Sequence, residues 1–162
     1  HEGNILEFNG LNKLSDAAAE SLSKHQGDVL DLNGLEELSD AAAKALSKHQ
    51  GTGLSLLGLT EVSDAAAESL SRHEGFLYLG LTELSDAAAK SLSKQFGELS
   101  LDWLTELSDA AAESLSKHEG NLSLEGLAKL SDVAATSLSK YEGKIGGEDP
   151  KEWVEYLRAN KE

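Results

Sequence analysis

The sequence contains no cysteine and no methionine, one proline and few aromatic residues. Without cysteine, neither a disulfide framework nor a thiolate metal site can form. Because proline is almost absent, the 15 glycines must supply most of the breaks between elements. Aromatic residues make up 5% of the chain and hydrophobic residues 40%, so leucine and alanine provide most of the apolar surface. This composition predicts many small, similar contacts in place of one large core.

Basic residues are also scarce, since 14 lysines and arginines oppose 29 aspartates and glutamates, for a formal net charge of -15. Such a chain repels the phosphate backbone of nucleic acids and the anionic surface of membranes. No apolar run approaches the roughly 20 residues that a membrane-spanning helix requires. We therefore expect no nucleic-acid and no membrane binding, and favour proteins, basic ligands or cations as partners.

A repeat runs through most of the chain, with the consensus L-x-L-x-G-L-x-x-L-S-D-A-A-A-x-x-L-S-K-H-x-G. Its Ser-Asp pair recurs at steps of 24, 24, 22, 23 and 23 residues, beginning at Ser15, Ser39, Ser63, Ser85, Ser108 and Ser131. Six copies cover residues 5 to 143, and His1-Glu2-Gly3 matches the end of a further copy. Self-similarity at this period indicates a solenoid.

Each copy combines two hydrophobic periodicities. Leucines alternate with polar residues at positions 30–32, as in a half-buried strand, whereas Ala42 and Leu46 share one face of a helix. Ser39 is suited to cap the start of that helix, and we expect Gly51 to stop it in a left-handed conformation. Stacked copies predict an α/β, right-handed solenoid with a parallel sheet on the concave face and short helices on the convex face.

These residues resemble the leucine-rich-repeat family, in particular its short bacterial type with Ala-rich helices and about 23 residues per repeat. The resemblance rests on the L-x-L strand, the period and the helix-forming second half of all six copies. One position departs from the family, which carries Asn or Cys at the bend after the strand. This chain has leucine there, so the backbone at the bend must be satisfied in another way: Leu11, Leu35, Leu59, Leu81, Leu104 and Leu127.

The repeat pattern breaks after Gly143, and we divide the chain into a repeat array at residues 1–147 and a C-terminal capping helix at residues 148–162. Asp149 and Pro150 are typical of the residue before a helix and of its first position. Trp153, Tyr156 and Leu157 fall on one helical face. We expect this face to cover the last repeat.

The N-terminal end has no comparable cap. Leu6 and Phe8 are predicted to lie in an open edge strand, which permits self-association through pairing with another chain. Because the sequence lacks methionine, we expect that it is either part of a longer chain or a designed protein.

Polar residues that recur with the repeat could suggest chemistry. A histidine column could bind zinc or nickel, but no carboxylate or thiolate recurs beside it, and we favour a structural role at the helix ends: His25, His49, His73 and His118, with Gln95 and Tyr141 completing the column. The recurring aspartates are better explained by helix starts than by calcium. No nucleophilic triad, phosphate loop or dinucleotide motif is present. We expect no enzyme, no metal site and no cofactor.

The positions that differ between copies are the ones that carry information about function. Phe76 and Tyr78 stand in sheet-facing columns, and Trp103 replaces a glycine of the other copies. Aromatic side chains beside acidic groups are typical of binding hot spots, and they predict a basic protein partner at Leu57, Phe76, Tyr78, Glu98, Ser100, Asp102 and Trp103. In the alternative interpretation, Trp103 fills space left by a one-residue deletion in the fourth copy.

We therefore expect a non-enzymatic module that binds a protein through its concave face. One alternative is a structural or self-assembling protein that joins through its ends. Another is a designed repeat scaffold without a native ligand, because the helices are nearly identical. The unequal repeat lengths and Trp103 argue against a pure consensus design.

Overall fold

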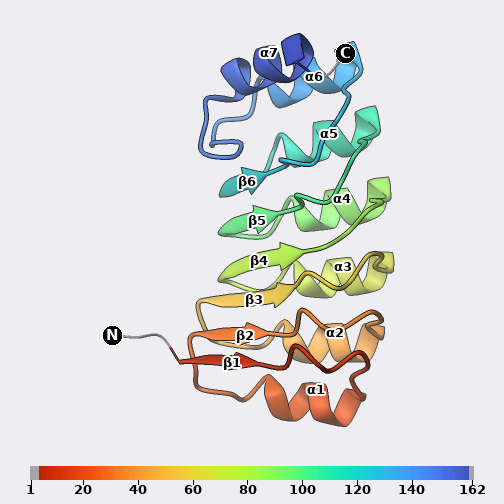
Figure 1. Cartoon of the computed structure of the whole chain (residues 1–162), viewed down its shortest axis with the longest axis vertical. Helices are drawn as coiled ribbons and strands as arrows, with labels where there is room; N and C mark the ends of the chain where they lie inside the picture. Colours follow the sequence, from red (N-terminus) through yellow and green to blue (C-terminus); the bar gives the residue numbers. More distant parts are fainter. Residues whose placement is uncertain (1–3, 161–162) are drawn as a thin grey trace.

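The computed structural model describes residues 4–160, which form a stack of strand-helix units (Figure 1). Within this range the strands build one open parallel sheet in chain order: β1 (Ile5–Glu7), β2 (Val29–Asp31), β3 (Gly53–Leu56), β4 (Phe76–Leu79), β5 (Glu98–Ser100) and β6 (Asn121–Ser123). The helices form a second layer: α1 (Asp16–Leu22), α2 (Asp40–Leu46), α3 (Asp64–Leu70), α4 (Asp86–Leu92), α5 (Asp109–Leu115) and α6 (Asp132–Leu138), followed by α7 (Pro150–Asn160). The predicted α/β solenoid is confirmed.

The core lies between the sheet and the helices and continues through the stack. Parallel register places the same leucine of each strand beside its counterpart in the next, from Leu30 to Leu122. These leucines are buried, as are the paired alanines on the inner face of α2 to α6. Alanine leaves little side chain between neighbouring helices, and each helix packs on the next. One unit could not bury both of its faces alone, so stacking supplies the core.

The Ser-Asp pair has two roles in the stack. Ser39 Oγ accepts a hydrogen bond from the Ala42 amide at 3.0 Å, which caps α2, and donates to Asp16 Oδ1 of the preceding helix at 2.5 Å. The same serine-to-aspartate bond recurs at each later junction: Ser63 to Asp40, Ser85 to Asp64, Ser108 to Asp86 and Ser131 to Asp109. The dipeptide therefore caps each helix and joins it to the one before.

The recurring glycine has a different role from the one we predicted. Among the described residues, positive φ angles occur at Gly97, Gly146 and Gly147, so Gly51 is not a left-handed stop and that prediction is wrong. A Cβ at Gly51 would overlap the Asp28 carbonyl oxygen of the preceding repeat. Glycine is required there because two backbones approach closely, which no side chain would allow.

The C-terminal segment continues the stack beyond β6. Ile145 forms a parallel bridge to Leu122, and α7 then begins with Asp149 Oδ1 accepting the Lys151 amide at 2.9 Å, which confirms the helix cap. The buried face of α7 consists of Pro150, Val154 and Leu157. Tyr156 is 63% exposed, so its predicted place on the buried face is wrong. The domain division at residue 147 stays a prediction.

Arg158 of α7 completes the serine-aspartate series at this end. Its Nη2 donates to Asp132 Oδ1 at 2.5 Å, in the place where the serine of a following repeat would donate. The aspartate of α6 therefore accepts a hydrogen bond from α7, as the aspartates of the earlier helices do from the serine of the next repeat. The final two residues of the predicted capping helix, 161–162, lie outside the described residues.

The N-terminal end exposes groups that interior repeats bury. Leu6 and Leu22 are partly buried, whereas Leu30 and Leu46, their counterparts in the next repeat, are fully buried. β1 is an edge strand, and Ile5 is 55% exposed. The partial repeat predicted at residues 1–3 lies outside the described residues. Across residues 4–160, no helix has the length and apolar character needed to cross a membrane.

Candidate binding surface on the sheet

The outer side of the sheet, here called the sheet face, consists of the strand residues that alternate with the buried leucines. Parallel register places Gly53 beside Phe76, and it places Ser55 and Ser100 on either side of Tyr78. Among the outward strand positions within residues 4–160, Glu7, Asp31 and Glu98 are acidic and none is basic. The face is therefore negatively charged, as expected from the composition of the chain.

Phe76 and Tyr78 of β4 form a stacked pair at the middle of the sheet face. Their ring centroids are 4.7 Å apart and the ring planes differ by 27°. The Phe76 ring extends over β3, where a Cβ on Gly53 would overlap it. Gly53 therefore provides the space for this ring. Sequence reasoning did not assign Gly53 a role, although it is the one glycine in a column that otherwise carries side chains.

Tyr78 reaches toward the opposite neighbour, β5. Its hydroxyl donates a hydrogen bond to Glu98 Oε1 at 2.7 Å. Burial raises the pKa of Tyr78 to about 12, and the hydrogen bond and negative charge of Glu98 act in the same direction. Ser55 and Ser100 on the two adjacent strands are buried. The aromatic pair thus spans three strands and is held in place by contacts on both sides.

Asp102 lies just beyond β5 and has structural partners of its own. Its Oδ2 accepts the Ser100 hydroxyl at 2.8 Å, and its Oδ1 accepts the Glu125 amide of the next repeat at 3.0 Å. Asn33 makes the equivalent contact to the next repeat, because its Oδ1 accepts the Leu57 amide. The same oxygen also accepts the hydroxyl of Ser55 in that next repeat. A polar side chain after the strand therefore satisfies the backbone at two of the bends. Asp102 supplies this contact as well as negative charge.

Leu57 and Trp103 stand at the same edge of the sheet face. Leu57 is partly buried, and Trp103 is 57% exposed. A Cβ on Gly80 would overlap the Leu57 carbonyl oxygen, as a Cβ on Gly58 or Gly126 would overlap the carbonyl oxygen of the preceding repeat. More than half of the Trp103 side chain remains in solvent.

The histidine column lies away from the sheet face, at the helix ends. The rings of His25, His49 and His73 stack with centroids 6.3 and 6.1 Å apart. Later members bond to the glycine carbonyl of the preceding repeat: His118 Nε2 lies 3.0 Å from the Gly97 oxygen, and Gln95 and Tyr141 donate to the equivalent oxygens of Gly75 and Gly120. Within residues 4–160, no three histidines or carboxylates are grouped to hold a metal ion.

His49 and His73 are buried, and both are neutral at physiological pH. His73 is 1% exposed, and burial lowers its pKa to about 4, with the neighbouring His49 adding to the effect. The pKa of His49 is also lowered, by burial first and by His25 second. None of the ring nitrogens of His49 and His73 has a hydrogen-bond partner of good geometry. The histidine rings therefore pack in the loop between helix and strand in their neutral form. Protonation of a buried ring would be unfavourable.

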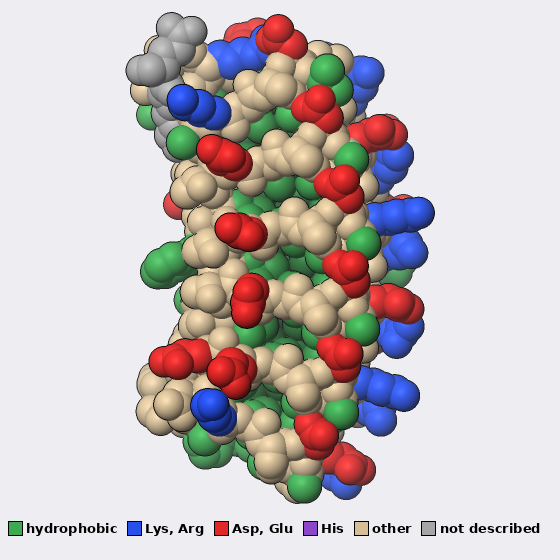
Figure 2. Space-filling model, turned by 90° about the vertical axis from the view of Figure 1, so that its right-hand side faces the viewer, with side chains coloured by type: hydrophobic (Ala, Val, Ile, Leu, Met, Phe, Trp, Pro, Cys, Tyr) green, Lys and Arg blue, Asp and Glu red, His purple; other side chains and the backbone are tan. Residues whose placement is uncertain are grey.

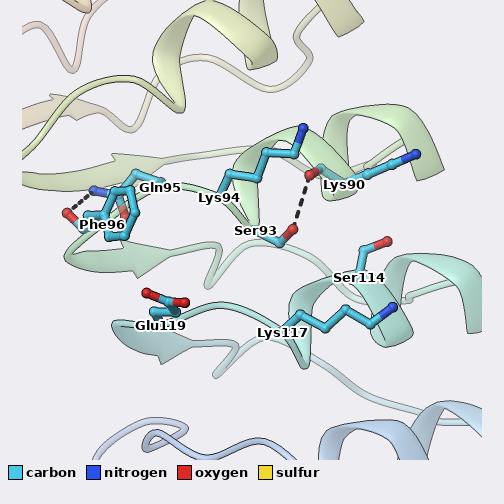
Figure 3. A pocket seen from close by; sticks show the side chains of 8 residues that line it. All are labelled: Lys90, Ser93, Lys94, Gln95, Phe96, Ser114, Lys117 and Glu119. Atoms are coloured by element: carbon cyan, nitrogen blue, oxygen red, sulfur yellow. Dashed lines mark hydrogen bonds between the residues drawn. The ribbon is translucent and has the colours of Figure 1, made fainter.

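A second surface lies at the C-terminal ends of α4 and α5, where a pocket of about 420 Å³ is lined mainly by Lys90, Lys94, Phe96 and Lys117 (Figure 3). Lys117 pairs with Glu113 at 3.0 Å, whereas Lys90 and Lys94 form no ion pair with any residue between 4 and 160. Phe96 is 66% exposed. Sequence reasoning missed this patch, although Phe96 interrupts a polar column: Gln26, Gln50, Glu74, Glu119 and Glu142.

The face at the helix N-termini is acidic along its whole length. Figure 2 shows carboxylates in columns that run from one end of the stack to the other. One column consists of the first-turn aspartates of α1 to α6. A negative charge at a helix N-terminus interacts favourably with the helix dipole. This interaction accounts for the recurrence of the aspartate in every repeat.

No family model, no curated protein and no solved structure matches this chain. The fold defines the protein as a repeat solenoid of alternating strands and helices. Its helices and core leucines repeat with little change, whereas the sheet face varies from copy to copy.

Proposed function

We propose that the chain is a non-enzymatic protein-binding module of the leucine-rich-repeat type, close to the short bacterial form. The proposed partner is a basic protein segment that lies along the sheet face. The observation that carries this proposal is the stacked pair of Phe76 and Tyr78, held over Gly53 and bonded to Glu98. The binding residues are Leu57, Phe76, Tyr78, Glu98, Ser100, Asp102 and Trp103.

An ordered aromatic pair suits this role for two reasons. Its rings are already fixed by neighbouring strands, so little side-chain entropy remains to be lost on binding. Ring faces beside carboxylates attract lysine and arginine through cation–π and charge interactions. Glu98 supplies the charge next to the rings, and no outward strand residue within the described range opposes it. Both features favour a basic partner over an acidic one.

The proposal assigns no reaction to the chain because its repeated polar groups already have structural uses. The serines cap helices and bond to aspartates of neighbouring repeats, and the later members of the histidine column bond to backbone carbonyls. Asp102, just beyond β5, already accepts hydrogen bonds from the Ser100 hydroxyl and the Glu125 amide. Recognition by an exposed surface requires none of these groups to be reactive.

A peptide-display selection tests the proposal. We expect the wild-type chain to enrich peptides that are rich in lysine and arginine. Replacement of Phe76, Tyr78 and Trp103 by alanine should weaken binding of an enriched peptide at least tenfold, as is typical for the loss of several aromatic contacts. The Phe96→Ala variant is the matched control, because it removes an exposed ring from another face. Equal binding by the triple variant, or selection without basic residues, would contradict the proposal.

Two alternatives remain as proposals. Self-assembly is favoured by the exposed edge of β1, by Ile5 within this strand and by Phe8 directly after it. A designed scaffold without a native ligand is favoured by the near identity of the helices. The selection separates the second alternative from binding, since a scaffold without a ligand site would enrich no common sequence.

A further inference from the structure

A pocket of about 550 Å³ lies at the C-terminal end of the stack, away from the aromatic pair of the sheet face. One wall is a stripe of α7 formed by Glu152, Trp153 and Tyr156. Glu148 in the segment before α7 and Glu125 in the loop after β6 also line the pocket. The pocket therefore brings two aromatic rings and three carboxylates together from three parts of the chain.

Backbone hydrogen bonds and buried side chains hold the walls of this pocket in place. Glu148 lies on a tight turn that is closed by backbone hydrogen bonds with Ile145 in both directions, at 3.0 and 3.2 Å. Val154 and Leu157 anchor α7 in the core. Tyr156 stays largely exposed because the buried face of the helix is already filled by other side chains. The Trp153 and Tyr156 side chains therefore line the pocket, although Trp153 also packs partly against the core.

The charge of the pocket selects the kind of ligand. Of the described residues that line it, three are glutamates and none is lysine, arginine or histidine. Arg158, the nearest arginine along α7, is turned to Asp132. Carboxylates alone would attract any cation, but the faces of tryptophan and tyrosine favour organic ammonium groups, whose alkyl surface contacts the rings. A hard metal ion gains nothing from ring faces, since it is held by converging oxygens.

We propose that this pocket binds an organic ammonium cation, with Trp153 and Tyr156 contacting the alkyl groups and Glu148 and Glu152 facing the charge. The site uses none of the residues proposed for the sheet face. Its test is therefore independent of the partner-binding proposal.

Choline is a suitable probe, and 3,3-dimethylbutan-1-ol is its uncharged isostere. In a Trp103→Phe background Trp153 is the one tryptophan of the chain, so its emission reports on the pocket. At constant ionic strength we expect a saturable change in emission with choline, and binding of the isostere at least tenfold weaker. Equal response to both compounds would overturn the proposal, as would the absence of saturation.

Variants locate the effect in the pocket. Glu152→Gln and Tyr156→Ala should each weaken choline binding at least threefold, because each removes one element of recognition. Glu155→Gln is the matched control, since Glu155 lies on α7 and is exposed but does not line the pocket. Circular dichroism melts confirm that the variants stay folded. Equal weakening by Glu155→Gln, or displacement of choline by calcium chloride at matched ionic strength, would overturn the assignment.

Discussion

The ring of Phe76 occupies space that exists because residue 53 has no side chain. The two residues are 23 positions apart and face each other through parallel register between β3 and β4. Phe76 stands out in the sequence and Gly53 does not, but together they determine the conformation of the aromatic pair. The absence of a side chain at residue 53 therefore controls the conformation of the proposed binding surface.

We expect Gly53→Ala to destabilise the fold by about 1–3 kcal/mol, the usual cost of overpacking. The added methyl group would overlap the Phe76 ring and displace it from its stacked position on Tyr78. Urea unfolding measures the change. In a Phe76→Ala background the same substitution should cost much less, because the overlapping ring is gone. An equal cost in both backgrounds would show that the backbone, and not the ring, requires glycine.

His73 makes the stability of the protein dependent on pH. Its pKa is lowered from 6.5 to about 4 in the folded state, so the unfolded chain binds the proton more tightly. The contribution of neutral His73 to the free energy of unfolding is therefore complete above about pH 6.5 and is lost as the pH falls toward 4. By pH 5 we expect a loss of about 2 kcal/mol in the free energy of unfolding from this group alone.

Urea unfolding at pH 7.5 and pH 5.0 measures this loss. In His73→Gln the difference between the two pH values should be smaller, because glutamine does not titrate. Gln95 shows that the column accepts glutamine, since it occupies the equivalent position in the next repeat. If the variant and the wild type lose the same free energy between the two pH values, His73 is not the responsible group.

At the scale of the element, α7 illustrates how packing selects one helical face from several candidates. Trp153, Tyr156 and Leu157 could share a face by their spacing, yet the buried residues are Pro150, Val154 and Leu157. Val154 replaces Tyr156 in contact with the core. The orientation of α7 about its axis is also fixed by Arg158, whose partner is on α6.

Leu157→Ala and Tyr156→Ala test this orientation as a pair. Leu157 is buried, so its truncation should lower the free energy of unfolding by about 2–5 kcal/mol. Tyr156 is mostly exposed, and its removal should change stability by less than about 0.5 kcal/mol. Chemical unfolding measures both variants. A larger effect at Tyr156 than at Leu157 would mean that α7 packs through a different face.

At the scale of the whole molecule, the two ends of the stack differ. α7 packs on α6 and Ile145 bridges to β6, whereas β1 and α1 leave partly exposed groups whose counterparts are buried in the next repeat. An open edge strand offers unpaired backbone groups to another chain. The high negative charge opposes close approach of two copies. Self-association should therefore be favoured by salt, which screens this repulsion.

We expect the average mass measured by sedimentation to rise with protein concentration, and to rise further at high salt. Replacement of Ile5 and Phe8 by lysine should reduce this rise, because charged side chains on an edge strand disfavour pairing. Val133→Lys is a control, since Val133 is also exposed but lies on α6 at the other end. A mass that stays at one chain over the whole concentration range would remove self-assembly from the proposals.

Much of the fold could be predicted from the sequence because it is local and repeated. Leucine alternation, helix spacing and the Ser39 cap are each contained within a few residues, and six copies repeat the same signal. The sheet-facing columns followed from the same period, and the observed register confirms them. The residues proposed for binding were found as exceptions to the repeat, and their role in recognition stays a prediction.

The repeating unit and the order of its copies in the stack are therefore encoded within the sequence of each repeat. Tertiary structure decided the rest: that Gly51 allows close approach of backbones, that Asp102 satisfies the next bend, and that Phe96 and Tyr156 are exposed. The physical reason is the range of the interactions. Each of these features depends on residues about one repeat apart, or in separate elements, which meet only when the copies stack.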